Sequence, residues 1–301
     1  MLMRSSLIAA VLLVSAGLGT LPVGAQELTG TLKKIKDTGS ITLGHRESSI
    51  PFSYYDDQQR VVGYSQDLAM KVVDALKKQL NMPNLQVKLN PVTSQTRIPL
   101  VQNGTVDLEC GSTTNNTERQ KQVAFSNSIF IIGTRLLTKN TSGIKDFPDL
   151  AGKTVVTTAG TTSERLIRKM NEDKKMGMSI ISAKDHAESF LILQSGRAVA
   201  FMMDDALLYG ERAKSKNPDE LVVVGTPQSY EAYGCMMRRD DPQFKKTVDD
   251  ALAAVMRGGE AEKLYAKWFL SPIPPKGVNL NFPLSPELST LFKVPNDKAF
   301  E

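Results

Sequence analysis

The strongest constraint on the fold is a pattern that occurs twice. Residues Gln102–Cys110 and Gln194–Met202 each read as the end of a helix, a glycine that closes it, and an apolar strand. Each strand then runs into polar residues, Ser112 and Thr114 in the first copy and Asp204 in the second. Two α/β lobes of similar construction would produce this pattern, although helix–glycine–strand units also recur by chance in any α/β protein.

The first 25 residues read as an export signal and not as part of either lobe. Arg4 is their only charge, the apolar stretch Leu7–Leu18 follows, and small residues favour cleavage after Ala25. The apolar run is too short and too interrupted by glycine and serine to span a membrane. No cysteine lies near the cleavage point to carry a lipid, so the sequence predicts a protein free in the periplasm.

The remaining composition narrows the function classes. The 301 residues are enough for two domains, each with its own core. The formal net charge of +5 is mild, and basic residues are scattered among acidic ones, so nucleic acid is not an expected partner. Two cysteines in an oxidising compartment permit one disulfide, with two separately buried thiols as the alternative.

A polar loop follows the strand of the first copy. Thr105–Cys110 reads as a buried strand and Glu118–Ala124 as the start of a short helix. The loop between them carries Ser112 and Thr114, and Arg119 lies just beyond it. Hydroxyls, backbone N–H groups and a guanidinium together can bind a carboxylate. A plain polar turn with a solvent-facing arginine would contain the same residue types.

Two further strands end in basic and hydroxyl residues. Ser40–Gly44 runs into a polar cluster containing Arg46, and Leu85–Leu89 leads into Ser94 and Arg97. Strand ends followed by loops are where α/β folds place their ligand contacts. Taken alone, the two arginines are also compatible with salt bridges at the surface.

The second lobe is expected to begin near Asp146 and to offer an anion site of its own. A strand of β-branched residues leads into Ala159–Glu164, whose last four residues suit a capping box at the start of a helix. Free N–H groups at a helix N-terminus attract a carboxylate, but an ordinary capped helix has the same sequence. Ile180–His186 reads as a strand that ends at one of only two histidines.

Other elements follow from periodicity and capping residues. The helix beginning at Asp67 is expected to use that aspartate as its N-cap. The tail after residue 257 is expected to end in a proline-rich, irregular segment. Further predicted elements are the helices Ala206–Lys214 and Pro242–Arg257 and the strands Leu221–Val224 and Glu231–Arg238.

Together these segments resemble the periplasmic solute-binding proteins that feed polar amino acids to ABC transporters (bacterial solute-binding protein family 3). The resemblance extends over nearly the whole chain after the leader. The segments that carry it are His45–Tyr55, Ser94–Leu100, Glu109–Asn116, Ser182–His186 and Phe201–Leu208.

The resemblance implies an α/β, two-lobed type II periplasmic binding protein fold in which the chain crosses a hinge twice. Residues 26–131 would form the first part of lobe 1, residues 132–233 would form lobe 2, and residues 234–301 would form the return to lobe 1 and the tail. Cys110 and Cys235 would both lie near the crossover, where a disulfide between them is plausible.

The resemblance also implies roles for individual residues. An α-carboxylate would be bound by Arg119, Ser112 and Thr114, with Thr162 from the opposite lobe. Asp204 would pair with an ammonium group. A second, distal carboxylate would be bound by Arg46, Ser94, Arg97 and His186. The implied site has no catalytic residue, metal or cofactor.

Three guanidiniums against one carboxylate predict an acidic amino acid, L-glutamate or L-aspartate, because buried charges must be paired. The implied protein is a monomer that closes on this ligand and delivers it to the permease of an ABC transporter. One alternative is a dehydratase-like enzyme on the same fold, with Glu109 or Asp205 as a general base. The other is a soluble ligand-sensing accessory.

Overall fold

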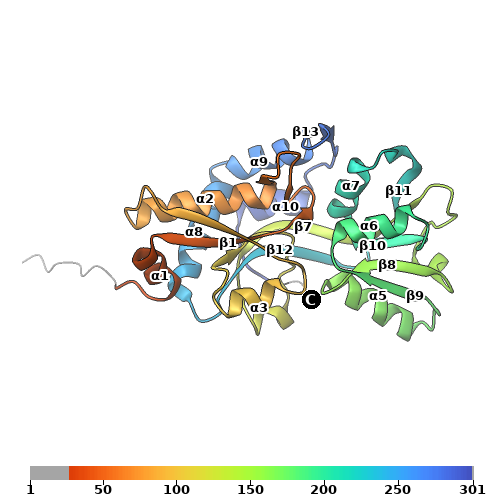
Figure 1. Cartoon of the computed structure of the whole chain (residues 1–301), viewed down its shortest axis with the longest axis horizontal. Coiled ribbons are helices and arrows are strands. Elements are labelled where there is room, and N and C mark those ends of the chain that lie inside the picture. Colours follow the sequence, from red (N-terminus) through yellow and green to blue (C-terminus); the bar gives the residue numbers. More distant parts are fainter. Residues whose placement is uncertain (1–26, 300–301) are drawn as a thin grey trace, which may run out of the picture.

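The computed structural model describes residues 27–299, so the predicted export signal lies outside the described residues. Figure 1 shows two α/β lobes side by side, joined by long strands. The first half holds α1 (Gly30–Thr38), β1 (Ser40–His45), β2 (Ser48–Ser49), β3 (Ser53–Tyr55), β4 (Val61–Val62), α2 (Tyr64–Gln79), β5 (Gln86–Pro91), α3 (Arg97–Gln102), β6 (Leu108–Glu109), α4 (Thr117–Gln120) and β7 (Ala124–Lys139).

The second half starts with a 3-10 turn at Phe147–Leu150. It continues with β8 (Thr154–Thr158), α5 (Thr162–Asp173), β9 (Ser179–Ala183), α6 (His186–Gln194), β10 (Ala200–Asp204), α7 (Asp205–Lys214), a 3-10 turn at Pro218–Glu220, β11 (Leu221–Val224), β12 (Tyr230–Met237), α8 (Pro242–Arg257), α9 (Glu260–Phe269), β13 (Pro272–Ile273), β14 (Val278–Asn279) and α10 (Pro286–Lys293). None of the helices in residues 27–299 is long and apolar enough to cross a membrane.

One sheet runs through both lobes in the order β5-β1-β6-β12-β7-β10-β8-β9, with β11 also paired to β7. We call the part around β1, β5 and β6 lobe 1, and the part around β8, β9 and β10 lobe 2. The neighbouring strands of each part are parallel, so their carboxyl ends share one edge.

The hinge consists of two antiparallel strands. β7 pairs with β12 as far as Gly133 and with β10 from Thr134 onward, so the first crossover lies inside one continuous strand. The predicted lobe boundaries at 131/132 and 233/234 fall within β7 and β12. A disulfide joins Cys110, just after β6, to Cys235 on β12, across a sequence separation of 125 residues.

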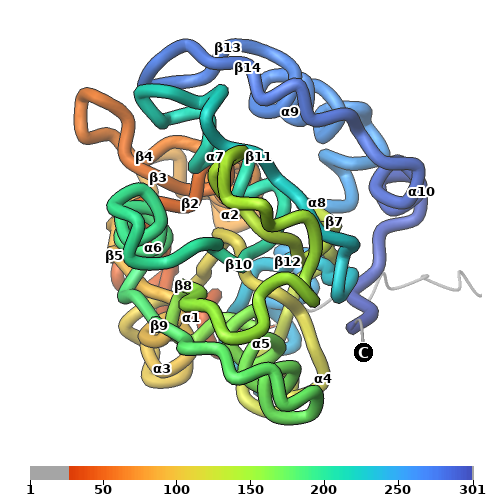
Figure 2. The backbone as a smooth tube through the Cα atoms, turned by 90° about the vertical axis from the view of Figure 1, so that its right-hand side faces the viewer, coloured from red at the N-terminus to blue at the C-terminus, as the bar shows by residue number. Residues whose placement is uncertain are grey.

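The expected irregular tail is only partly confirmed, because two helices follow α8, whereas residues 294–299 have no helix or strand. The helix α9 buries Tyr265, Trp268 and Phe269, which recur at helical spacing, and the rings of Tyr265 and Phe269 stack with centroids 4.5 Å apart. In Figure 2, α10 lies on the opposite side of the hinge strands from α6. Prolines near these helices disfavour regular structure, but the burial of apolar side chains stabilises the helices.

Asp67 is not the N-cap that the sequence predicts. The helix α2 begins earlier, at Tyr64, after Gly63 with φ 137°. A side chain on Gly63 would collide with the carbonyl of Phe52, so glycine is required at this close approach. Asp67 instead accepts a hydrogen bond of 2.7 Å from the indole of Trp268 in α9.

Two predicted boundaries shift for local reasons. His186 opens α6 and does not end β9, because Asp185 caps that helix by accepting the backbone N–H of Glu188 at 2.9 Å. The helix predicted at Glu118–Ala124 is the single turn α4, and Ala124 already belongs to β7.

Candidate functional site

All nine predicted ligand-binding side chains are buried, and they follow the carboxyl ends of parallel strands. Their exposed fractions do not exceed 8%. They come from both lobes, which brings the predicted site to the junction between them. Lobe 1 contributes Arg46 after β1, Ser94 and Arg97 after β5, and Ser112, Thr114 and Arg119 after β6, and lobe 2 contributes Thr162 after β8, His186 after β9 and Asp204 at the end of β10.

The two lobes meet closely beside these residues. Gly160, after β8, has φ +78°, and a Cβ on it would lie 2.8–2.9 Å from atoms of Ser94 and Gln95 in lobe 1. The guanidinium of Arg119 donates across the junction to the carbonyl of Gly160 at 3.3 Å. Glycine is therefore needed for the backbone conformation and for the close approach of the lobes.

The residues predicted for the α-carboxylate surround a carboxylate that the sequence interpretation missed. Glu231 on β12 accepts hydrogen bonds from the hydroxyls of Thr114 at 2.5 Å and Thr162 at 2.7 Å, one from each lobe. Arg119 donates to the carbonyl of Thr114 at 2.9 Å. An acidic residue in an otherwise largely apolar strand was the available sequence signal for Glu231.

The residues predicted for the distal carboxylate hold buried polar atoms without partners. Within residues 27–299, Ser94 Oγ, Arg97 Nε and His186 Nε2 have no hydrogen-bond partner. The guanidiniums of this group contact the loop after β6. Arg97 donates to the carbonyl of Ser112 at 3.0 Å, and Arg46 donates to the Ser112 hydroxyl at 3.5 Å.

The charge count expected from the sequence, three guanidiniums against one carboxylate, needs correction. Glu109 and Glu231 join Asp204 as buried carboxylates in this region. Each carboxylate is held by hydroxyl groups, however. Glu109 accepts from Thr113 at 2.8 Å, and Asp204 accepts from Ser163 at 3.1 Å and from Tyr233.

None of the three arginines forms an ion pair with any carboxylate in the described part of the chain. Isolated buried charges are costly by several kcal/mol, roughly, unless a partner of opposite sign compensates them. The charges of Glu109, Glu231 and Asp204 act on the three guanidiniums from a distance, but within residues 27–299 none of them is a direct ion-pair partner, and a bound anion could supply that contact.

Burial and mutual repulsion shift the protonation equilibria of the site. Desolvation, reinforced by the positive charge of Arg97, lowers the pKa of Arg119 to about 9 and that of Arg46 to about 10. Both groups still carry their charge at neutral pH. Desolvation and the nearby Glu231 raise the pKa of Asp204 to about 7. Desolvation, followed by repulsion from Arg46 and Arg97, lowers the pKa of His186 well below its usual value.

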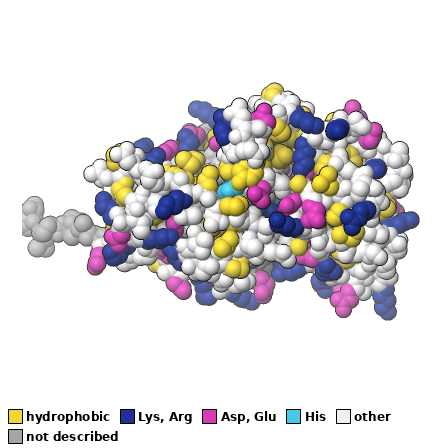
Figure 3. Space-filling view, viewed as in Figure 1, with side chains coloured by type: hydrophobic (Ala, Val, Ile, Leu, Met, Phe, Trp, Pro, Cys, Tyr) yellow, Lys and Arg dark blue, Asp and Glu magenta, His cyan; other side chains and the backbone are white. Residues whose placement is uncertain are grey.

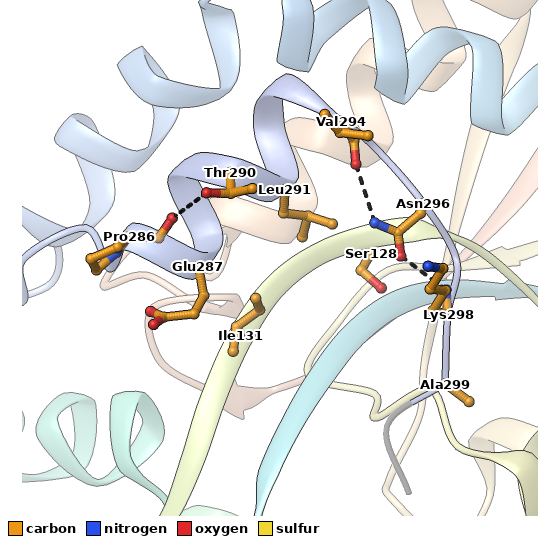
Figure 4. Close-up of a pocket in the computed structure, with 10 residues that line it drawn as sticks. All are labelled: Ser128, Ile131, Pro286, Glu287, Thr290, Leu291, Val294, Asn296, Lys298 and Ala299. Atoms are coloured by element: carbon orange, nitrogen blue, oxygen red, sulfur yellow. Dashed lines mark hydrogen bonds between the residues drawn. The ribbon is translucent and has the colours of Figure 1, made fainter.

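One surface hollow borders the site, and another lies apart from it. A groove of about 430 Å³ reaches Thr114, Thr162 and Glu231 at the outer edge of the site. A cavity of about 830 Å³ lies away from the site, between α10 and β7, and Figure 4 shows Asn296 and Lys298, after α10, beside Ser128.

Basic and acidic side chains are intermixed over the face seen in Figure 3. Among residues 27–299, no three His, Cys, Asp or Glu side chains are grouped so that they could hold a metal ion.

The chain is similar to amino-acid-binding proteins over almost its whole length. An L-glutamate/L-aspartate-binding protein of Pseudomonas aeruginosa is 68% identical, with 96% of each chain covered. A glutamate/aspartate import solute-binding protein of Escherichia coli is 65% identical, with 96% of this chain and 95% of the relative covered. Among solved structures, an ancestral arginine-binding protein bound to glutamine is 29% identical, with a TM-score of 0.69, and the match covers 77% of this chain and 98% of that one.

The family comparison agrees with the two-lobed architecture. Residues 41–271 match the model of the bacterial extracellular solute-binding proteins, family 3. This match and the likeness to solved structures confirm the predicted α/β, two-lobed fold class. The chain therefore belongs to the bacterial extracellular solute-binding proteins, family 3.

Proposed function

We propose that this protein captures L-glutamate or L-aspartate between its lobes and delivers it to the permease of an ABC transporter. The observation that carries the proposal is the set of three buried guanidiniums that have no ion pair within residues 27–299, Arg46, Arg97 and Arg119. A dicarboxylate compensates that charge better than any neutral amino acid. The relatives at 65–68% identity, whose names include glutamate and aspartate, support the same ligand class.

Each end of the ligand has its own set of partners in this proposal. The α-carboxylate is bound by Arg119, Ser112 and Thr114 with Thr162, and the ammonium group pairs with Asp204. The distal carboxylate meets Arg46, Arg97, Ser94 and His186, where the unpartnered Nε of Arg97, Oγ of Ser94 and Nε2 of His186 supply hydrogen-bonding capacity.

Closure follows from the division of these partners between two lobes. A ligand that contacts both lobes favours the closed arrangement by its differential affinity. In the proposed cycle the permease recognises the closed, loaded form. The protein acts by binding alone, in keeping with relatives that are named as binding proteins.

The proposal also covers the location and state of the mature chain. The leader is removed after Ala25, the protein works in the periplasm as a monomer, and the lobes divide within β7 and β12. Mass spectrometry of protein from a periplasmic fraction should give an N-terminus at Gln26, and size-exclusion chromatography with light scattering should give one chain per particle.

Isothermal titration calorimetry with glutamate, aspartate, glutamine and histidine tests the ligand class directly. Glutamine is the matched control, because it has nearly the shape of glutamate without the distal charge. We expect glutamine to bind at least about 3 kcal/mol more weakly, or over roughly 100-fold, since it leaves the distal guanidiniums uncompensated. Equal binding of glutamine and glutamate would overturn the roles of Arg46 and Arg97.

A further inference from the structure

Behind the proposed distal site, two hydroxyl groups contact the imidazole of His186. Thr158, the last residue of β8, places its Oγ1 2.9 Å from Nδ1 of His186 and 2.8 Å from Oγ of Ser189. His186 and Ser189 lie three positions apart on α6, so they share one helix face. All three side chains are at least 99% buried. The ring is therefore anchored at one nitrogen by a short chain of hydroxyls.

The other ring nitrogen is the one available to a ligand. His186 Nε2 is buried and has no hydrogen-bond partner within the described residues, and burial, reinforced by repulsion from Arg46 and Arg97, lowers the pKa of the ring and favours its neutral form. A neutral imidazole carries one proton, on either Nδ1 or Nε2. With the proton on Nδ1, Nε2 presents a lone pair, which repels a carboxylate and accepts an amide N–H. With the proton on Nε2, the ring donates to a carboxylate.

The hydroxyl contacts permit the second tautomer. The Nε2–H form requires Nδ1 to accept a hydrogen bond, which Thr158 can donate while its oxygen accepts from Ser189. The Ser189 hydroxyl also lies 2.9 Å from the carbonyl of Asp185. That carbonyl and the carbonyl of Thr157, at 3.3 Å, can each accept the Ser189 proton, and Thr158 can donate its own proton to Nδ1 whichever acceptor Ser189 uses.

We propose that Thr158 is a positioning residue that fixes the proton of His186 on Nε2, so that the site selects a distal carboxylate over a distal amide. Ser189 supports this role by holding the Thr158 hydroxyl in place through their contact of 2.8 Å. The inference rests on the proposed function, because it specifies how that same site separates glutamate from glutamine.

The test compares three variants in calorimetric titrations with glutamate and glutamine. Thr158→Val keeps the shape of the side chain and removes the hydroxyl, whereas Thr158→Ser keeps the hydroxyl. Thr157→Val is the matched control, since the neighbouring Thr157 is also buried but donates to the carbonyl of Met202 at 3.1 Å. We expect Thr158→Val to weaken glutamate and to lower the glutamate-to-glutamine affinity ratio by roughly 3- to 10-fold, the worth of one hydrogen bond. Thr158→Ser and Thr157→Val should keep the ratio of the unsubstituted protein.

Nitrogen-15 NMR of the imidazole rings reads the tautomer independently of affinity. The chain has only two histidines, and His186→Gln identifies the signals of one of them. With glutamate bound, His186 should show a protonated Nε2 and an unprotonated Nδ1, and Thr158→Val should shift the population toward a protonated Nδ1.

Two results would overturn the inference. One is a protonated Nδ1 in the glutamate-bound unsubstituted protein, and the other is an unchanged affinity ratio in Thr158→Val. If Thr158→Val does not fold, the tautomer of His186 in the glutamate-bound unsubstituted protein still decides the matter. A protein that does not bind glutamate at all would instead refute the proposed function, and calorimetry without any substitution distinguishes the two failures.

Discussion

Ligand affinity should rise with pH between about pH 6 and pH 8, because Asp204 titrates in this range. Asp204 is buried at the end of β10, where desolvation and the charge of Glu231 raise its pKa to about 7. The ammonium group of a bound amino acid would stabilise the anion and lower this pKa. Binding below about pH 7 must therefore release a proton, and protonation of Asp204 must compete with the ligand.

The size of the effect follows from this pKa. If only the deprotonated form binds, the apparent Kd equals the limiting Kd multiplied by 1 + 10^(pKa − pH), with a pKa of about 7. The expected weakening is about 2-fold at pH 7 and about 10-fold at pH 6, with little change above about pH 8. The ligand itself does not change charge over this range, since a free side-chain carboxyl titrates near about pH 4.

Calorimetry in two buffers with different ionisation heats measures the released proton directly. We expect about half a proton at pH 7 and close to one at pH 6. Tyr233→Phe removes a hydroxyl that donates to Asp204 and lowers its pKa, so this variant should move the profile to higher pH. Asp205→Asn tests the neighbouring carboxyl, whose own pKa burial raises to about 6; its charge also raises the pKa of Asp204, so this variant should move the profile slightly to lower pH. A Kd that stays constant within about 2-fold from pH 6 to pH 8, without proton release, would refute the reasoning.

Three further predictions each concern a substituted protein, measured by calorimetry or by denaturant titration. Arg97→Met should weaken glutamate by at least about 3 kcal/mol in calorimetry and remove most of the preference over glutamine; unchanged affinity would make this arginine structural. Replacing Cys110 and Cys235 by serine should lower the free energy of unfolding by about 2–5 kcal/mol in denaturant titrations, because their bond closes a loop of 125 residues. Asp241→Ala should lower the free energy of unfolding by about 2–3 kcal/mol in the same assay, since Asp241 caps α8 and also accepts a hydrogen bond from Thr31. Asp250→Ala, on the exposed face of α8, is the control and should lower it by under about 0.5 kcal/mol.

Elements with strong local signals were predictable residue by residue. The helix Pro242–Arg257 and the strand Leu221–Val224 have the bounds expected from the sequence. The helix has an aspartate N-cap and a proline in its first turn, and the strand is a run of apolar, mostly β-branched residues between turns. Capping residues and β-branched runs depend only on neighbours within a few residues, so such elements can be predicted from the sequence alone.

The chemistry of the site was predictable in kind but not in full. Arg46, Arg97 and Arg119 follow strands, as expected for ligand contacts in an α/β fold, and all three are buried. Glu231 was missed, although it bridges Thr114 and Thr162. It lies more than a hundred residues from Thr114 along the chain, so no local pattern relates the two.

Only the tertiary structure decided which distant groups meet. Asp67 has the residue type and position of an N-cap, yet it binds the indole of Trp268, 201 residues away. The strand β7 continues through both lobes because β12 and β10 pair with successive parts of it. Residue types and their spacing determined the helices, the strands and the cationic character of the site, because these depend on neighbours along the chain. Packing between remote segments decided the partner of each buried charge, because desolvation and pairing depend on neighbours in space.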